Sequence, residues 1–262
     1  MRSENRVRTA CTLNPETVQK ILDLNRQFYQ TLASQFSATR QRLQPGVRRV
    51  LANLAPQANL LDLGCGNGEL WRSLVGAGHL GRYVGLDFSS ELLRAATQDG
   101  NASPTRVSKD GLVRAFFLQA DLSAPDWEEI VPSPPFDVTL AFAVLHHLPG
   151  DDLRLQVLAK VRRLLVPEGC FIHSEWQFLN SPRLRTRIQP WEAVGLLTEQ
   201  VDPGDYLLDW KHGGYGLRYV HHFNQAELEH LAQISGFDIT ESFVSDGEGE
   251  NLGLYQVWRP RA

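Results

Sequence analysis

The sequence has few cysteines and no long apolar run, and both absences restrict what the chain can be. Its three cysteines are odd in number and lack the paired spacing of a disulfide framework, which indicates a reduced, cytoplasmic protein. No apolar stretch approaches the roughly 20 residues that a membrane-spanning helix needs. The first residues, Met1-Arg2-Ser3-Glu4-Asn5-Arg6, also lack the apolar segment of a signal peptide. We therefore expect a cytoplasmic protein without a membrane partner.

Metal-binding spacings are missing as well. The sequence contains two pairs of adjacent histidines, His146-His147 and His221-His222, but neither pair is accompanied by a Cys-x-x-Cys or His-x-x-x-His spacing. Structural zinc sites take their ligands from such closely spaced pairs. We therefore expect no bound metal.

Charge is unevenly distributed along the chain. The formal net charge is −4, but residues 1–50 contain nine basic and three acidic residues. A basic segment on an acidic body could contact an anionic partner such as nucleic acid. A solvated helix face is the commoner explanation of such a segment, and the sequence leaves both open.

The spacing of apolar residues predicts the secondary structure. A helical period predicts helices at residues 15–36, 45–54, 69–75, 90–96, 151–165 and 225–235. Short apolar runs predict strands at residues 59–63, 82–87, 114–119, 136–142 and 170–176, and a hairpin of 237–244 with 252–258. Residues 98–112 read as a surface loop and residues 167–169 as a turn. Strands that alternate with helices form parallel sheets with right-handed crossovers. The sequence therefore predicts an α/β fold with a doubly wound, mostly parallel sheet of seven strands.

A glycine-rich turn follows the first predicted strand. The run Leu60-Leu61-Asp62-Leu63 leads into Gly64-Cys65-Gly66-Asn67-Gly68, and Asp87 ends the next predicted strand about twenty residues later. Glycine can adopt positive φ and lets the backbone approach a ligand closely. An acid at this distance holds a ribose in doubly wound nucleotide-binding folds. Asp62 would repel a phosphate at this turn but would suit a cationic ligand.

This segment resembles motif I of the class I S-adenosylmethionine-dependent methyltransferases. The resemblance implies a Rossmann-like fold, S-adenosylmethionine as cofactor, and Asp87 as the acceptor of hydrogen bonds from the ribose hydroxyls. It also implies that Asp121 contacts the adenine amino group, although a helix or turn cap is a fair rival, and that residues 141–148 line the methyl-transfer centre. The cofactor-binding residues that it implies are Tyr29, Arg40, Asp62, Gly64, Cys65, Gly66, Asn67, Asp87, Phe88, Ser89, Asp121, Leu122, Ala141 and Phe142.

The order of these segments predicts one methyltransferase domain over residues 1–262. Residues 1–55 would form an N-terminal helical cap, residues 56–176 the cofactor-binding core, and residues 225–262 the last helix and hairpin of the sheet. Residues 177–224 show no clean period and are too long for a plain loop in a compact domain. We expect them to form a substrate-side insertion or lid.

A narrower resemblance concerns the segment before the glycine-rich turn. Residues 29–40, with Tyr29, Phe36-Ser37 and Thr39-Arg40, resemble the tRNA wobble-uridine carboxymethyl methyltransferases, as does Leu217-Arg218-Tyr219-Val220-His221-His222-Phe223. Those enzymes esterify the carboxylate of 5-carboxymethyluridine, and some similar enzymes require a small activating subunit. The resemblance therefore implies two partners, a tRNA and a small activating subunit. The insertion at 177–216 has no counterpart in that family, which leaves the methyl acceptor open.

The chemistry of a carboxylate acceptor indicates which residues would act on it. A carboxylate is ionised at neutral pH, so it needs alignment and a cation rather than a base. Arg40 and Arg218 could hold it, with Tyr29 and Tyr219 as hydrogen-bond donors, although an arginine can equally cover apolar surface with its stem. His147 is expected to pack under the site, and a general-base role ranks below that one. The candidate catalytic residues are Arg40, His147, Arg218 and Tyr219.

Two other functions remain open at this point. A small-molecule methyltransferase, acting on a quinone, a polyketide or another metabolite, would use the insertion as an apolar lid with Trp176, Trp191, Trp210 and Tyr215. A cofactor-binding partner protein without transfer activity would keep the same glycine-rich turn. Three arginines at 183, 185 and 187 would share one side of an extended segment and could contact phosphates, although a solvated charge run is commoner.

Overall fold

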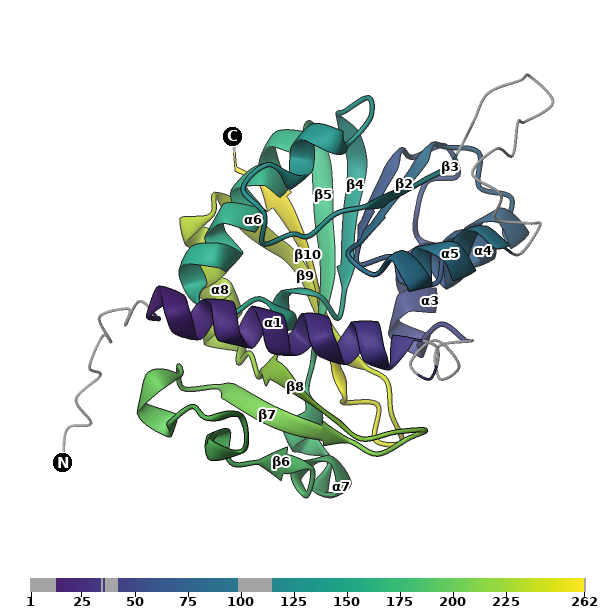
Figure 1. Ribbon diagram of the computed structural model, residues 1–262. Coiled ribbons are helices and arrows are strands. Elements are labelled where there is room, and N and C mark those ends of the chain that lie inside the picture. Colours follow the sequence, from purple (N-terminus) through teal and green to yellow (C-terminus); the bar gives the residue numbers. More distant parts are fainter. Residues whose placement is uncertain (1–12, 34, 36–41, 99–114, 262) are drawn as a thin grey trace.

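A seven-stranded sheet forms the centre of the molecule (Figure 1). The computed structural model describes residues 13–33, 35, 42–98 and 115–261. The strands of this sheet are β1 Leu60–Leu63, β2 Tyr83–Asp87, β3 Ala115–Gln119, β4 Phe136–Phe142, β5 Leu165–Trp176, β9 Phe237–Ser245 and β10 Gly253–Pro260. Their order is β3-β2-β1-β4-β5-β10-β9; β10 pairs antiparallel with both β5 and β9, and the strands from β3 to β5 pair in parallel. This order confirms the predicted doubly wound, mostly parallel sheet of seven strands.

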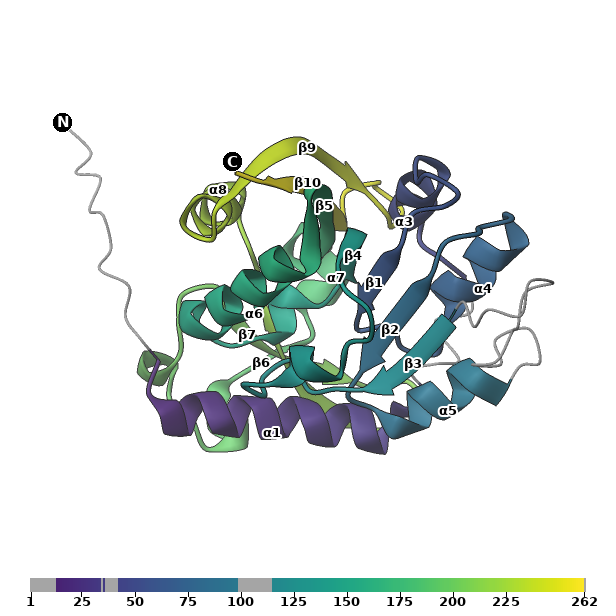
Figure 2. The ribbon, with the colours of Figure 1, turned by 90° about the horizontal axis from the view of Figure 1, so that it is seen from above.

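Helices cover both faces of the sheet (Figure 2). On one face, α3 (Pro45–Ala52), α4 (Glu69–Gly76) and α5 (Ser90–Gln98) contribute Val50, Trp71 and Leu93 to a core with the strands. On the other face, α6 (Asp151–Leu164) and α8 (Gln225–Ile234) contribute Val157 and Leu231 to a second core. Because each helix buries one apolar stripe against the sheet, two continuous cores fix the positions of the strand ends.

A smaller antiparallel sheet lies beside the main one. It consists of β6 (Ile188–Gln189), β7 (Asp205–Trp210) and β8 (Gly216–His221), in that order. The short helix α7 (Pro182–Arg185) precedes it. Within the described residues, five 3₁₀ helices connect these elements, at Trp127–Ile130, Leu145–His147, Phe178–Asn180, Trp191–Val194 and Thr198–Gln200.

Helix α1 (Pro15–Thr31) crosses the molecule between the two sheets (Figure 1). It begins where the Asn14 side chain accepts a hydrogen bond from the backbone N–H of Glu16, with Pro15 at its first position. It buries Ile21, Asn25, Phe28 and Tyr29, whose spacing puts them on one face. Ile21 packs with Leu207 and Tyr219 of the smaller sheet. The helix therefore buries part of this face against the smaller sheet.

Three sequence predictions need correction. The first helix ends at Thr31 rather than at residue 36, and residues 36–41 lie outside the described residues. The turn expected at residues 167–169 is an irregularity within β5, where Leu165 pairs with Phe136 and Cys170 with Val138. The arginines at 183, 185 and 187 do not share one side of an extended segment. Residues 182–185 form the helix α7, and Arg187 forms an ion pair with Asp209. The loop expected at residues 98–112 lies almost wholly outside the described residues.

Candidate functional site

A cavity of about 540 Å³ opens at the carboxyl ends of the parallel strands. Its walls come from the glycine-rich turn, from the residues that follow β2, β3 and β4, and from α1 and β8. Ligands of open α/β sheets bind at this edge, and ligand pockets usually measure about 300–1,000 Å³. The cavity therefore has the place and the size of a ligand site.

The glycine-rich turn forms one wall of this cavity. Gly64 has a φ of +72°, and a Cβ on it would lie 2.7 Å from the Val144 Cγ2 atom. Gly66 has a φ of +55°, and a Cβ there would meet no atom within 4 Å. The first glycine is thus required by packing, whereas the second leaves open space beside the backbone, as a closely bound ligand requires.

Asp87 closes the end of β2 and faces the same cavity. Its carboxylate accepts hydrogen bonds from the backbone N–H of Gly66 at 2.9 Å and of Ser89 at 2.8 Å. Burial raises its pKa to about 6, although these hydrogen bonds act in the opposite direction. A carboxylate oxygen can accept a second hydrogen bond, so a pair of ribose hydroxyls fits the acceptor capacity that remains.

Asp62 lies in β1 and lines the cavity two residues before the first glycine. The Tyr83 hydroxyl donates a hydrogen bond of 2.5 Å to its Oδ2 atom. Burial raises the pKa of Asp62 to about 7, the Tyr83 hydrogen bond lowers it, and the charge of Asp87 raises it further. Two carboxylates at one end of a buried cavity would repel a phosphate and favour a cation. This acidic end, Asp62 and Asp87, therefore fits S-adenosylmethionine, which carries an ammonium and a sulfonium but no phosphate.

Asp121 follows β3 and also lines the cavity. Its Oδ2 accepts a hydrogen bond from the Nε atom of Arg26 at 2.8 Å, and its Oδ1 accepts from the backbone N–H and the hydroxyl of Ser123 at 2.9 and 2.6 Å. Burial would raise the pKa of Asp121, but the hydrogen bonds from Ser123 and the Arg26 guanidinium outweigh it and lower the pKa. Asp121 is therefore ionised and joined to α1. No local pattern in the sequence indicates this role for Arg26, because its partner Asp121 lies 95 residues away.

His147 connects α1 to the smaller sheet. Its Nε2 lies 2.8 Å from the Tyr29 hydroxyl, and its Nδ1 lies 3.1 Å from the backbone carbonyl oxygen of Tyr219. Because a carbonyl oxygen only accepts hydrogen bonds, Nδ1 carries a proton, and when the ring is neutral Nε2 accepts from the Tyr29 hydroxyl. This arrangement fits the structural role expected for His147 better than a proton-transfer role.

His146 has a different environment. Its Nδ1 lies 2.9 Å from Oε2 of Glu175, and the other oxygen of Glu175 lies 2.9 Å from Nδ1 of His173. Glu175 and His173 are fully buried, and both Glu175 and His146 line the cavity. Burial raises the pKa of Glu175 well above its ordinary value and lowers that of His173 to about 3. Glu175 therefore lies at the cavity wall with its two oxygens against the Nδ1 atoms of two histidines. Glu175 was not predicted, because nothing in the sequence links residues 146 and 175.

Arg218 projects from β8 into the cavity and is buried, with 5% of its surface exposed. Its guanidinium carbon lies 5.0 Å from the ring centre of Trp176, 5.4 Å from that of Phe28 and 5.6 Å from that of Trp210. Its Nε has no hydrogen-bond partner, and no carboxylate among the described residues forms an ion pair with it. A buried cation in an aromatic enclosure without an anion is suited to bind one from a ligand.

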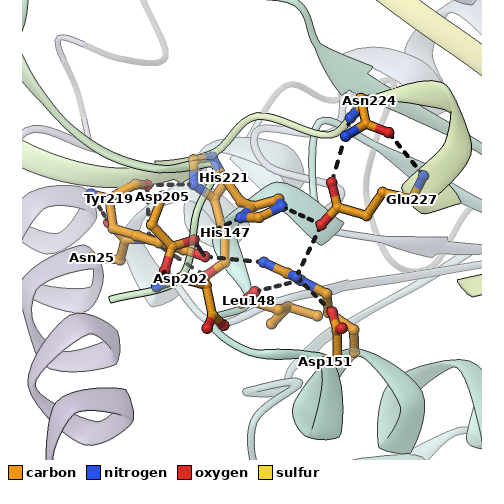
Figure 3. A network of polar contacts seen from close by, with 11 residues as sticks. Asn25, His147, Leu148, Asp151, Asp202, Asp205, Tyr219, His221, Asn224 and Glu227 are labelled. Atoms are coloured by element: carbon orange, nitrogen blue, oxygen red, sulfur yellow. Dashed lines mark hydrogen bonds and ion pairs between the residues drawn. The ribbon is translucent and has the colours of Figure 1, made fainter. Parts of the chain in front are cut away.

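Tyr219 does not reach the cavity, because its side chain belongs to a buried polar network (Figure 3). Its hydroxyl donates to Oδ1 of Asp205 at 2.8 Å and accepts from Nη2 of Arg154 at 3.1 Å. His221 lies 2.6 Å from Asp205 and 2.7 Å from Glu227. Burial and the charge of Arg154 lower the pKa of His221, but the bonds to these carboxylates outweigh them and raise it. The network joins the smaller sheet to α6 and α8, and the Tyr219 hydroxyl lies in this network rather than in the cavity.

The remaining predicted site residues differ in whether they line the cavity. Those that line the cavity beside the groups above are Cys65, Asn67, Phe88, Leu122 and Phe142. Ser89 contacts the carboxylate of Asp87 without lining the cavity, and Ala141 is fully buried in β4. Arg40 lies outside the described residues.

The predicted aromatic lid is only partly present. Trp176 lines the cavity, and Trp210 contacts it indirectly through Arg218. Trp191 instead packs with Ile21 in the core between α1 and the smaller sheet, and Tyr215 is 64% exposed. In the part of the chain that the structure describes, no helix is long and apolar enough to cross a membrane. The same residues contain no group of three or more His, Cys, Asp or Glu side chains that could hold a metal ion.

Comparisons with known proteins agree with this geometry. A methyltransferase-domain family model matches residues 61–171. A protein of Encephalitozoon cuniculi named as a methyltransferase is 31% identical over 215 residues, which cover 82% of this chain and 87% of that protein. The tRNA (carboxymethyluridine(34)-5-O)-methyltransferase of Schizosaccharomyces pombe is 28% identical over 232 residues, which cover 82% of this chain and 89% of that protein.

A solved structure shares the fold. A chain in the complex between the Haloferax volcanii Trm112 methyltransferase activator and a methyltransferase has a TM-score of 0.61 and 15% identity, with 92% of this chain and 98% of that chain covered. The relatives, the strand order and the acidic end of the cavity point to the same chemistry. The chain therefore belongs to the class I S-adenosylmethionine-dependent methyltransferases, and S-adenosylmethionine is its cofactor.

Proposed function

We propose that the chain transfers a methyl group to a carboxylate, and that its acceptor is the carboxymethyl group on the wobble uridine of tRNA. The observation that carries this proposal is Arg218, a buried guanidinium that lines the cavity and has an Nε without a partner. An acceptor carboxylate would supply the missing anion. Charge-assisted hydrogen bonds of this kind are about twice as strong as neutral ones.

The residues of the chain would then hold the two reactants in line. S-adenosylmethionine, when bound, supplies an electrophilic methyl group on its sulfonium. Asp87 would accept hydrogen bonds from the ribose hydroxyls, Asp62 would attract the positive charge, and Asp121 would accept from the adenine amino group. Arg218 would orient the carboxylate, which is ionised at neutral pH and needs no base. Trp176 and Tyr29 would exclude water from the reacting atoms, so alignment and desolvation supply the rate enhancement.

Two observations support RNA as the carrier of this carboxylate. The S. pombe relative is named as a tRNA carboxymethyluridine methyltransferase. Arg42 and Arg183 are exposed and line the same cavity as Arg218, so cations continue from the buried guanidinium to the surface. Exposed arginines can contact phosphates, which position RNA without reading its sequence.

The test is incubation of the protein with tRNA that bears 5-carboxymethyluridine and with radiolabelled S-adenosylmethionine. We expect a labelled methyl ester that mild base hydrolyses, and a loss of at least about tenfold in kcat/KM for Arg218→Met, because the acceptor loses a charge-assisted partner. Arg162→Met, which changes an exposed arginine of α6, is the matched control and should retain full activity. Absence of the ester from a protein that binds the cofactor, both alone and with its activating subunit, would refute the proposed acceptor.

A small activating subunit is part of the same proposal. The structural neighbour from H. volcanii was solved in complex with a methyltransferase activator. The assay should therefore be run both with the isolated chain and with the chain co-purified with the Trm112-type protein of its source. Activity that appears only with the subunit would support a dependent enzyme, and equal activity in both would show that the chain is sufficient.

A second candidate is methylation of a small molecule whose attacking atom carries a proton, such as a phenol or a ring N–H. The pair of Glu175 and His146 favours it, since a buried carboxylate that orients a histidine is the usual arrangement of a general base. The two candidates differ in pH dependence. At saturating cofactor, methylation of a carboxylate should change little between about pH 6 and 8, whereas Glu175→Gln should reduce methylation of a phenol selectively.

A further inference from the structure

Arg26 makes an unusual set of contacts for a residue of the N-terminal helix. Its Nε donates to Oδ2 of Asp121 at 2.8 Å, its Nη2 donates to the Ser123 hydroxyl at 2.9 Å, and its Nη1 donates to Asp23 at 2.6 Å. Burial would lower the pKa of Arg26, but Asp121 and Asp23 outweigh it and raise the pKa. The guanidinium is therefore charged, and a hydrogen bond from each of its three nitrogens fixes its orientation.

These contacts determine how the Asp121 carboxylate is oriented and how a ligand can reach it. A carboxylate has about four acceptor positions. Ser123 occupies two on Oδ1, through its backbone N–H and its hydroxyl, and Arg26 lies 2.8 Å from Oδ2 with both its Nε and its Nη2 atoms. The Asp121 side chain is nevertheless 36% exposed and lines the cavity, so a ligand in the cavity can reach its carboxylate.

We propose that Arg26 is a positioning residue for the cofactor: it fixes the carboxylate of Asp121 so that the part of it exposed in the cavity meets the exocyclic amino group of adenine. The inference rests on the cofactor and on the proposed role of Asp121, and it does not depend on the methyl acceptor. It also makes α1 part of the cofactor site, because Leu22, Asn25 and Tyr29 of the same helix line the cavity with Arg26.

The test uses two ligands that differ at one group of the base. S-adenosylhomocysteine carries the amino group, and S-inosylhomocysteine has an oxygen in its place. Calorimetry should show that the wild-type protein prefers the adenosyl ligand by at least about tenfold, because a hydrogen bond to a charged group is lost with the inosyl ligand. Arg26→Met should lower this preference at least about fivefold, and Arg26→Lys should give an intermediate ratio because ammonium lacks the planar fork.

Two controls distinguish a role of Arg26 in orienting Asp121 from a role in merely holding α1 in place. Asp23→Asn removes the exposed partner of Arg26 and should leave the ratio within about twofold. In an Asp121→Asn background, Arg26→Met should have no further effect on the ratio. If Arg26→Met weakens both ligands equally, Arg26 only fastens α1 and the proposal is overturned. If that variant does not fold, an unchanged ratio in Arg26→Lys overturns it instead.

Discussion

The buried acids beside the glycine-rich turn bind protons more tightly than ordinary aspartates. Burial raises the pKa of Asp62 from 3.8 to about 7 and that of Asp87 to about 6. A bound cation reverses this effect, because it favours the ionised carboxylate. The ligand-free site is therefore partly protonated at neutral pH, and cofactor binding is expected to release protons.

Asp62 makes stability depend on pH in a predictable direction. Because its folded-state pKa lies above its unfolded-state pKa, its contribution is fully present below about pH 4 and is lost as the pH rises through about 7. Relative to Asp62→Asn, the free energy of unfolding of the ligand-free wild type should fall by a few kcal/mol over this range, at about 1.4 kcal/mol per pKa unit. Urea denaturation at several pH values measures it, and parallel profiles for the two proteins would contradict it.

Asp87 should control cofactor affinity more directly. Asp87→Ala removes the proposed acceptor of the ribose hydroxyls, so the binding free energy of S-adenosylhomocysteine should weaken by roughly 1–3 kcal/mol. Calorimetry at pH 8, where the wild-type carboxylate is ionised, gives the difference. Asp152→Ala changes an exposed aspartate of α6 and should bind as the wild type does.

Single residues could be predicted where their role depends on local sequence. The glycine-rich turn and Asp87 follow strands that their own apolar runs define, so the sequence placed them at the cavity. Tyr83, Arg26 and Glu175 act through partners 21, 95 and 29 residues away. No local pattern specifies such a pairing, so they became visible only in the fold.

At the scale of elements, the junction of β1 with α4 depends on glycines that have different surroundings. Gly64→Ala would place a Cβ 2.7 Å from Val144, whereas Gly66→Ala and Gly76→Ala would meet no atom within 4 Å. We expect Gly64→Ala to cost at least about 2 kcal/mol of stability and Gly66→Ala about 1–2 kcal/mol for its left-handed backbone.

Gly76 is the internal control for this series. It ends α4 without a positive φ, so Gly76→Ala should be neutral or stabilise the protein by up to about 1 kcal/mol. Thermal and urea unfolding rank the three variants. An equal cost at Gly64 and Gly66 would show that Val144 moves aside and that packing does not select the first glycine.

Helices and strands could be predicted from the sequence where the spacing of apolar residues kept one period over the whole element. The strands of the main sheet and the helices on its faces follow from their apolar spacing. The smaller sheet was not predicted, because prolines and short 3₁₀ helices interrupt the region before it. One local pattern could have indicated it: Gly213-Gly214 separates the apolar-rich runs that form β7 and β8, as in a hairpin.

At the scale of the whole molecule, Arg154 connects parts that are distant in sequence. It is fully buried in α6 and donates to the Leu148 carbonyl oxygen, to Asp151 and to the Tyr219 hydroxyl. Arg154→Met would leave the buried carboxylate of Asp205 without this compensating charge. We expect a loss of about 3–5 kcal/mol in the free energy of unfolding, measured by urea denaturation.

An exposed arginine on the same helix provides the comparison for Arg154. Arg162→Met should change stability by less than about 0.5 kcal/mol. Near-neutral behaviour of Arg154→Met would mean that His221 and its carboxylates rearrange around the missing guanidinium. The smaller sheet would then be held to α6 mainly by its apolar contacts.

The position of α1 has a consequence for biosynthesis. Asn25 of this helix bonds to the backbone of Tyr219, 194 residues further along the chain. At translation rates of about 5–20 residues per second, the helix leaves the ribosome roughly 10–40 s before its partner strand exists. The ligand cavity is therefore among the last features to form. A ribosome that stalled before β8 would carry a chain whose α1 still lacked the surface on which it docks.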